Sequence, residues 1–144
     1  MNILIYGLPT SGKSTFASKL VDKVGTGVIR HVNADKVREA FGDWEFTPQA
    51  RQRQALRMSA IGKLNEADGF NTIVDFVCPF NVYREMPQWD MTIYVNTIEE
   101  SPYEDTNKAF EEPKKEPTYT IFNWEEVDDI VEEVAYKLLN QEEE

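Results

Sequence analysis

Short apolar runs alternate along this chain with longer segments whose apolar positions recur at helical spacing. Five such runs occupy residues 3–6, 28–32, 72–77, 91–95 and 118–122. Largely apolar runs of this length are typical of strands that are buried on both faces of a parallel sheet. The pattern therefore predicts five β-strands at these places.

The segments between and after the strands have the spacing of amphipathic helices: residues 13–23, 35–41, 48–68, 82–86 and 124–139. Gly25 and Gly69 follow two of them, where helices commonly end, and Pro48 suits the first turn of the third. Strands that alternate with helices form a parallel sheet covered on both faces. We predict a single α/β domain over residues 1–144, a three-layer α/β/α sandwich around a five-stranded parallel sheet.

One segment breaks this pattern. Residues 99–117 contain three prolines, much charge and little periodicity. The segment is longer than an ordinary loop and follows the end of a strand, the edge at which parallel sheets bind ligands. We predict that residues 99–117 form a lid over an active site, and a solvated surface insertion is the alternative.

The turn after the first strand fits the phosphate-loop pattern G-x-x-x-x-G-K-[ST]. In such a loop, backbone N–H groups point at phosphate oxygens, and the following helix adds its positive end. Lys13 is predicted to reach the β- and γ-phosphates of ATP, and Ser14 to hold Mg²⁺ through its hydroxyl. The predicted ATP contacts are Gly7, Pro9, Thr10, Ser11, Gly12, Lys13, Ser14 and Thr15. A glycine-rich turn with a surface lysine is the alternative, but the apolar strand before it and the amphipathic helix after it favour a P-loop NTPase.

A phosphate loop alone does not separate a kinase from a nucleotide switch or a motor ATPase, and the small size favours a kinase. Asp35 follows the second strand, where a carboxylate can accept a proton from an attacking hydroxyl, so we predict a catalytic role. A helix cap is the alternative role for Asp35. Arg38 lies one turn further on, where it can neutralise an anionic acceptor. Arg51, in the first turn of the long helix, is predicted to bind substrate, and the roles of Arg53 and Arg57 stay open.

Asp75 lies in the third apolar run, and a charge in a central strand is costly unless it is paired. We predict that it orders the Mg²⁺ shell or a catalytic water near Ser14, and an ion pair with an arginine is the alternative. Cys78 is more typical of a packed small residue than of a nucleophile. His31, the one histidine, is expected to be structural.

Several stretches resemble the adenylylsulfate kinases, P-loop enzymes that phosphorylate the 3′-hydroxyl of adenosine 5′-phosphosulfate. Residues 7–15 resemble the phosphate loop of that family, 33–38 its D-G-D-N-V-R motif, 46–51 its F-S-x-x-D-R motif, and 67–80 its A-x-G … I-S-P-F segment. The resemblance implies an acceptor-side role for Asp35. It also implies that the acceptor is held by Arg38, Phe46, Arg51, Gln54 and Phe110, with Phe46 and Phe110 stacking on its base.

Some positions depart from the family pattern. Asn33 replaces the first acidic residue of D-G-D, Cys78 a serine, and Asn81 the arginine after P-F, while Asp75 replaces a small residue. The predicted lid is also shorter and more acidic than the lids of the family. These differences leave two alternatives open: a kinase for a hydroxymethylated base in DNA or a nucleotide, and a non-catalytic nucleotide-binding module. The compact chain is also similar to viral kinases of this type.

Composition and charge restrict the partners and the cellular location that we expect for the protein. The formal net charge of −11 argues against tight nonspecific binding to nucleic acid and leaves a small-molecule or nucleotide acceptor as the expected partner. One cysteine excludes an intramolecular disulfide, and no apolar run approaches the ~20 residues that span a bilayer. We expect a cytoplasmic protein (in the host cytoplasm if it is viral), a monomer or a homodimer, with no membrane partner.

Overall fold

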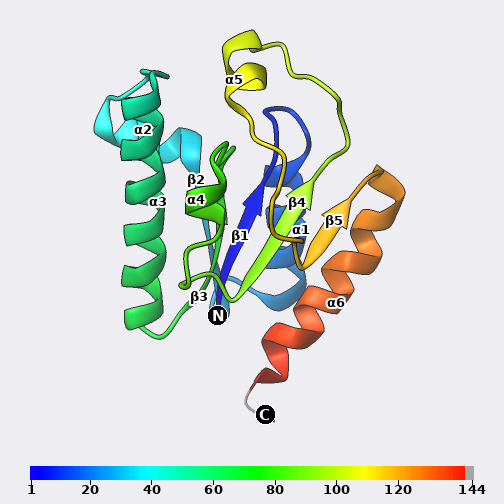
Figure 1. The fold of residues 1–144 in the computed structure, drawn as a ribbon. Coiled ribbons are helices and arrows are strands. Elements are labelled where there is room, and N and C mark those ends of the chain that lie inside the picture. The colour runs from blue at the N-terminus through cyan, green and yellow to red at the C-terminus, as the bar shows by residue number, and fades with distance from the viewer. Residues whose placement is uncertain (142–144) are drawn as a thin grey trace.

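The computed structural model, which describes residues 1–141, shows one five-stranded sheet with the strand order β2-β3-β1-β4-β5 (Figure 1). The strands are β1 (Asn2–Tyr6), β2 (Ile29–Asn33), β3 (Asn71–Asp75), β4 (Met91–Val95) and β5 (Tyr119–Ile121). All neighbouring pairs are parallel. The predicted parallel α/β sheet is therefore confirmed. The third strand ends at Asp75 and not at residue 77, because the following residues turn away from the sheet toward a short helix.

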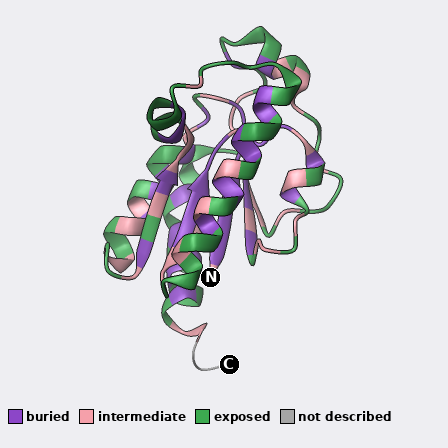
Figure 2. Cartoon of the chain, turned by 90° about the vertical axis from the view of Figure 1, so that its left-hand side faces the viewer, coloured by how far each residue is buried: buried purple, intermediate pink, exposed green. Residues whose placement is uncertain are grey.

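The helices cover the two faces of the sheet and make a three-layer sandwich. They are α1 (Lys13–Val24), α2 (Ala34–Phe41), α3 (Pro48–Ala67), α4 (Asn81–Arg84), α5 (Glu104–Ala109) and α6 (Val127–Leu139), with a 3₁₀ turn over Trp124–Glu126 before α6. Successive side chains of a strand point to opposite faces. Ile3 and Ile5 of β1 consequently join the core under α1 and α6, whereas Leu4 and Tyr6 join a second core with Met58 of α3. Figure 2 shows the strands buried between helices whose outer faces are exposed.

Helix α5 lies inside the segment for which the sequence predicted no regular structure. It has six residues and no side-chain cap. Asn107 stabilises its start instead, since its side-chain oxygen accepts hydrogen bonds from the backbone N–H and the hydroxyl of Ser101, at 2.9 and 2.7 Å. A helix this short has little intrinsic stability. It also has fewer than two turns, so its sequence carries almost no periodic signal.

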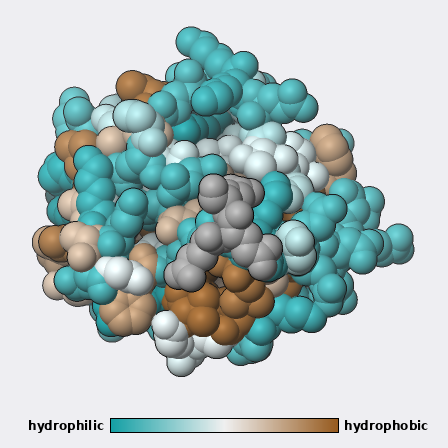
Figure 3. Space-filling view, turned by 90° about the horizontal axis from the view of Figure 1, so that it is seen from below, coloured by the Kyte–Doolittle hydropathy of each residue, from teal (hydrophilic) through white to brown (hydrophobic). Residues whose placement is uncertain are grey.

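The carboxyl ends of the strands point toward α5, which lies above that edge of the sheet (Figure 1). The opposite end, seen in Figure 3, is largely hydrophilic, with its largest hydrophobic area in the lower part of the view. Within residues 1–141, no helix combines the length and the apolar character needed to cross a bilayer. Because parallel α/β sheets bind ligands at the carboxyl ends of their strands, we expect a functional site at the edge under α5.

Candidate functional site

The turn between β1 and α1 has the backbone geometry of a phosphate loop. Gly7 and Gly12 have φ angles of +156° and +107°. A Cβ at Gly7 would lie 2.5 Å from the carbonyl oxygen of Val95, and one at Gly12 would lie 2.3 Å from the ring of Trp124. The backbone conformation favours glycine at both positions; at Gly7 the carbonyl also leaves no space for a side chain, and at Gly12 the Trp124 ring would have to move. Thr10 also has a positive φ, of 67°, so the loop is held in a conformation that side chains rarely adopt.

Lys13 begins α1 and lies almost completely buried beneath the loop. Its Nζ donates a hydrogen bond of 2.9 Å to the carbonyl oxygen of Leu8. Burial lowers the pKa of Lys13, while the charges of Asp75 and Asp35 act in the opposite direction. The ammonium group is thereby held between the loop and two carboxylates, where a negatively charged phosphate would gain most from it.

Ser14, His31, Asn33 and Asp75 form one hydrogen-bonded cluster at the ends of β2 and β3. The Oδ2 atom of Asp75 accepts hydrogen bonds from the Ser14 hydroxyl at 2.6 Å and the Asn33 amide at 3.1 Å, and it lies 3.0 Å from Nε2 of His31. The Asn33 amide also donates to the Ser14 hydroxyl at 3.0 Å. Asp75 is paired with these three side chains and not with an arginine, so the alternative of an arginine ion pair is wrong. His31, expected to be structural, takes part in this cluster.

Burial acts to raise the pKa of Asp75, but the hydrogen bonds from His31 and Ser14 and the charge of Lys13 outweigh it. The carboxyl pKa therefore lies below its usual range, and the group is ionised at neutral pH. The Ser14 hydroxyl and this carboxylate offer the oxygen ligands that Mg²⁺ prefers. No group of three or more His, Cys, Asp or Glu side chains within residues 1–141 could hold a metal ion alone. This donor set fits Mg²⁺ held together with ATP phosphates and water.

Asp35 lies in the first turn of α2, and its exposed side chain faces the same cleft as the phosphate loop. The cap of that helix is Asn33, whose side-chain oxygen accepts hydrogen bonds from the backbone N–H groups of Asp35 and Lys36, at 3.0 and 3.2 Å. The alternative that Asp35 caps the helix is consequently wrong. Its carboxylate does not cap the helix, and its negative charge acts to raise the pKa of Lys13.

Two buried arginines and a half-exposed phenylalanine form the wall opposite the phosphate loop. Arg38 donates to the carbonyl oxygens of Asp43 and Glu45 at 3.1 and 2.9 Å. The guanidinium groups of Arg38 and Arg51 lie 4.4 and 5.4 Å from the ring centroid of Phe46. Burial lowers the pKa of Arg38, and Asp43 acts against that shift. The predicted acceptor residues Arg38, Phe46 and Arg51 thus lie together.

The other side chains of α3 have different surroundings. Gln54 is buried, and its amide donates to the carbonyl oxygen of Ala34 at 3.0 Å, so it links α3 to the start of α2. Arg53 and Arg57, whose roles the sequence left open, both form ion pairs with Asp43, at 3.3 and 2.8 Å. They stabilise the loop before α3, and the cleft is lined by Gln54 but by neither of these arginines.

Helix α5 closes the third side of the cleft. The Nη2 group of Arg51 donates to the hydroxyl of Thr106 at 3.0 Å, and both residues are buried. Tyr103 from the same segment lines the cleft. Phe110 does not: its ring stacks on Tyr94 with 5.9 Å between centroids. The structure therefore places Phe110 in the second core, and its role in stacking on a substrate base stays a prediction.

These walls enclose a cleft of about 800 Å³. The predicted site residues that line it are Pro9, Thr10, Gly12, Lys13, Ser14, Thr15, Asp35, Arg38, Phe46, Arg51, Gln54 and Asp75. Gly7 and Ser11 belong to the same loop but do not line the cleft, and the Thr97 hydroxyl donates to the carbonyl oxygen of Ser11 at 2.7 Å. Sequence reasoning missed three lining aromatic residues, Trp44, Phe76 and Tyr103, and also Trp124 against Gly12. For Trp44 and Tyr103, the sequence signal is a large ring in a polar, loop-like segment.

Comparison with solved structures shows that the whole fold is shared with kinases. The crystal structure of APE1195 matches with a TM-score of 0.74 and 20% identity, covering 96% of this chain and 94% of the other. The Mycobacterium tuberculosis APS kinase CysC, in complex with AMPPNP and APS, matches with a TM-score of 0.71 and 19% identity, covering 96% of both chains. A gluconokinase from Sinorhizobium meliloti 1021 matches with a TM-score of 0.63 and 16% identity, covering 97% and 92%.

A search of curated protein sequences found no significant match. The family model described as adenylylsulphate kinase, in contrast, matches residues 1–112. That match covers the phosphate loop, the Ser14–Asp75 cluster and the wall formed by Arg38, Phe46 and Arg51. With the kinase fold and the cleft around the loop, it shows that this chain belongs to the adenylylsulphate kinase family.

Proposed function

We propose that the protein transfers the γ-phosphate of ATP to a hydroxyl group of a small acceptor, with adenosine 5′-phosphosulfate as the first candidate. One observation carries the proposal: a single cleft contains a phosphate loop, an exposed carboxylate and a wall with two arginines and an aromatic ring. A nucleotide-binding module would need only the first of these. A phosphotransferase also needs a bound acceptor and a group that orients its hydroxyl, which the wall and the carboxylate would supply beside the loop.

The donor side has the groups that phosphoryl transfer requires. Lys13 and the N-terminal end of α1 would bind the β- and γ-phosphates, and Ser14 and Asp75 would hold Mg²⁺ beside them. The metal ion, when bound, neutralises charge that develops on the phosphate oxygens. Asn33 and His31 orient the Asp75 carboxylate, because both contact its Oδ2 atom. The donor half would thus be aligned before the acceptor arrives.

On the acceptor side, Asp35 would accept a hydrogen bond, and then the proton, from the attacking hydroxyl. Arg38 and Arg51 would attract the anionic part of the acceptor, since each guanidinium group donates only some of its N–H groups to the protein atoms described above. Phe46 presents a half-exposed ring, 49% exposed, on which a planar group can stack. An acceptor that combines a base with an anionic group fits this wall.

Adenosine 5′-phosphosulfate has this combination, and the M. tuberculosis kinase was crystallised with it. Gluconate is a second small acceptor to test, because a gluconokinase shares the fold. A gluconate carboxylate could bind the arginines, but it would leave Phe46 and Trp44 without a partner. The exposed rings therefore favour the nucleotide acceptor.

The test is a transfer assay with γ-labelled ATP and Mg²⁺ against adenosine 5′-phosphosulfate, gluconate and hydroxymethylated DNA. We expect a labelled product with the nucleotide. Lys13→Met and Asp35→Asn should lower kcat by about 10²-fold or more. Asp68→Asn, the same change at an exposed residue that ends α3, is the matched control and should keep full activity.

The outcome of the panel decides between the alternatives. A labelled product with hydroxymethylated DNA alone would keep the phosphoryl transfer and replace the acceptor. Tight binding of ATP without transfer to any acceptor would refute the kinase proposal and support a nucleotide-binding module. Full activity of Lys13→Met would refute the mechanism.

A further inference from the structure

Arg84, in α4, is a buried arginine outside the cleft, and its guanidinium group binds two separate segments of the chain. It is 5% exposed. Its Nε donates to the carbonyl oxygen of Cys78 at 2.8 Å, and its Nη2 to that of Pro79 at 3.2 Å. Its Nη1 donates to the carbonyl oxygen of Glu111 at 2.8 Å. The first two acceptors belong to residues that line the cleft, whereas Glu111 lies where the chain returns from α5.

The loop that Arg84 holds has an unusual backbone. Cys78 has a φ angle of +46°, which is left-handed and is rarely adopted by residues with a side chain. Such conformations persist where surrounding contacts hold them, and they concentrate at functional sites. The bonds from Arg84 to the carbonyl oxygens of Cys78 and Pro79 are contacts of this kind. This part of the cleft wall therefore depends on a residue outside the cleft.

The segment that returns from α5 is held by the same small helix. The backbone N–H of Asn81 donates to the Glu111 carboxylate at 2.7 Å, and its side-chain amide donates to the carbonyl oxygen of Glu112 at 2.8 Å. The side-chain oxygen of Asn81 accepts from the backbone N–H of Lys114 at 3.2 Å and from Arg84 at 2.9 Å. Residues 78–84 and 111–114 are thus joined by several hydrogen bonds around one guanidinium group.

Aromatic rings enclose the same group. The Cζ atom of Arg84 lies 4.5 Å from the ring centroid of Tyr6 and 4.6 Å from that of Phe110. Tyr94 stacks on both rings, at 5.0 Å from Tyr6 and 5.9 Å from Phe110. Because Phe110 directly follows α5, the position of α5 depends on this stack as well. Cation–π contacts strengthen when the charge is shielded from water, as it is here.

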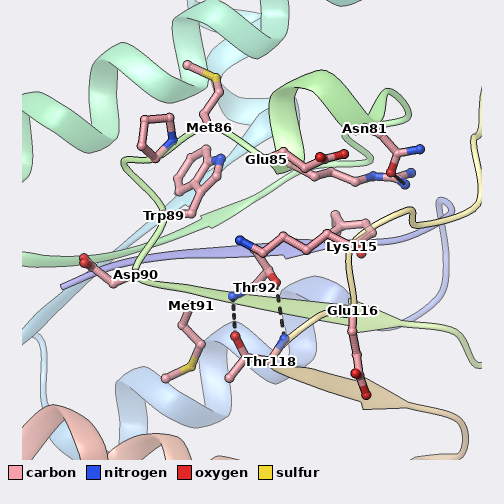
Figure 4. A pocket seen from close by; sticks show the side chains of 13 residues that line it. Asn81, Glu85, Met86, Trp89, Asp90, Met91, Thr92, Lys115, Glu116 and Thr118 are labelled. Atoms are coloured by element: carbon pink, nitrogen blue, oxygen red, sulfur yellow. Dashed lines mark hydrogen bonds between the residues drawn. The ribbon is translucent and has the colours of Figure 1, made fainter.

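Behind Arg84 lies a second cavity of about 230 Å³, which Arg84 and Tyr6 help to line. Figure 4 shows it between Asn81 of α4, Glu85 directly after that helix, the start of β4, and Lys115 and Glu116. Two hydrogen bonds between Thr92 and Thr118, at 3.1 and 3.3 Å, close its floor. Because a cavity lies on this side of Arg84, packing there does not hold the guanidinium group in place. Its hydrogen bonds and ring contacts must hold it instead.

We propose that Arg84 is a positioning residue that couples the segment returning from α5 to the Cys78–Pro79 wall of the cleft. The kinetic effect expected below rests on the proposed function, whereas the structural coupling itself does not. The hydroxyl of Thr106 in α5 accepts a hydrogen bond from Arg51. A shift of α5 would therefore displace Arg51 on one side of the cleft and the Cys78–Pro79 wall on the other. Loss of the coupling should therefore weaken acceptor binding while ATP binding is retained.

The single cysteine provides a direct probe, because Cys78 is 0% exposed and burial raises the pKa of its thiol. Iodoacetamide should alkylate native protein slowly, and Arg84→Lys should react about tenfold faster or more. Hydrogen exchange of residues 99–114 should accelerate in the same variant. Arg30→Lys is the matched control, since Arg30 also contacts a ring (Phe70, 3.6 Å) and an amide oxygen (Asn65, 3.1 Å) but lies at the other end of the sheet.

In the kinetic assay, Arg84→Lys should raise KM for the acceptor about tenfold, with KM for ATP unchanged. Glu111→Ala, at an exposed residue, removes only the carboxylate that Asn81 binds, so it decides the question if Arg84→Lys fails to fold. It should accelerate both alkylation of Cys78 and exchange of residues 99–114. Wild-type rates in a folded variant, or acceleration of one region without the other, would overturn the coupling. Absence of transfer by wild-type protein would count against the proposed function only.

Discussion

Asp75→Asn tests the donor side most directly. The substitution keeps the shape of the side chain and removes one negative charge beside Ser14. The carboxylate is 2% exposed, and its Oδ2 atom has contacts of 2.6, 3.0 and 3.1 Å with Ser14, His31 and Asn33. An amide at this place can accept fewer bonds, and its NH₂ group cannot accept any.

The size of the effect follows from these contacts. A hydrogen bond to a charged group contributes about 1.5–3 kcal/mol, and a change of about 1.4 kcal/mol is tenfold in an equilibrium constant. Loss of one such bond to Ser14, together with the charge that would hold Mg²⁺, should lower the affinity for Mg²⁺–ATP about 10- to 100-fold. The affinity for ATP without Mg²⁺ should change little, or increase, because a negative charge near the phosphates is removed.

Titration calorimetry with ATP, with and without Mg²⁺, measures both affinities. Asp128→Asn, the same chemical change at an exposed residue of α6 that pairs with Lys19, is the matched control. Equal affinity of Asp75→Asn and wild type for Mg²⁺–ATP would refute the metal role of Asp75. An equal loss with and without Mg²⁺ would show that the residue only shapes the loop.

The same variant has a consequence for stability. The pKa of Asp75 lies below its usual value of 3.8, so the folded state binds a proton less readily than the unfolded state does. The carboxylate therefore stabilises the fold above about pH 4, and this stabilisation is lost as the pH falls through the lower pKa of the folded state. Chemical denaturation of metal-free protein should show a shallower loss of stability below about pH 4 in Asp75→Asn. An unchanged pH profile would contradict the lowered pKa.

Two further predictions concern the two sides of the cleft. Gly12→Ala places a Cβ 2.3 Å from the ring of Trp124 at a φ of +107°, so ATP affinity and melting temperature should both fall, and Trp124→Ala in the same chain should restore part of the loss. No recovery in the double variant would show that backbone strain alone causes the defect. Phe46→Ala removes the half-exposed ring beside Arg38 and should raise KM for the acceptor about tenfold with KM for ATP unchanged. A fall in kcat alone would instead place Phe46 with the transferring groups.

Much of the donor side could be predicted because its signals are local. The phosphate loop is eight consecutive residues with an apolar strand before it and an amphipathic helix after it, and the structure has both. The carboxyl ends of parallel strands meet at one edge of the sheet. Asp35 and Asp75 could therefore be placed at that edge by topology alone. Arg38 and Arg51 were predicted from their places after the second strand and in the first turn of the long helix, and Phe46 from a family motif; all three line the cleft.

Other features depend on contacts between residues far apart in the chain. His31 joins Asp75 across 44 positions, and Arg51 joins Thr106 across 55. Neither pair has a periodic or compositional signal, because its two residues are far apart in the sequence and meet only in the folded chain. The short helix α5 was missed for the same reason, since its contacts to Arg51 and Ser101 support it more than its own six residues do.

The sequence by itself determined the succession of strands and helices along the chain, apart from α5, and the phosphate loop, because hydrophobic period and backbone conformation are properties of neighbouring residues. Tertiary structure alone decided which groups surround that loop: Asn33 and His31 on the Asp75 carboxylate, Trp124 against Gly12, and Arg84 between the cleft wall and α5. The physical reason is that hydrogen bonds and ring contacts act over a few ångströms in space. Only the folded sheet brings such distant positions that close.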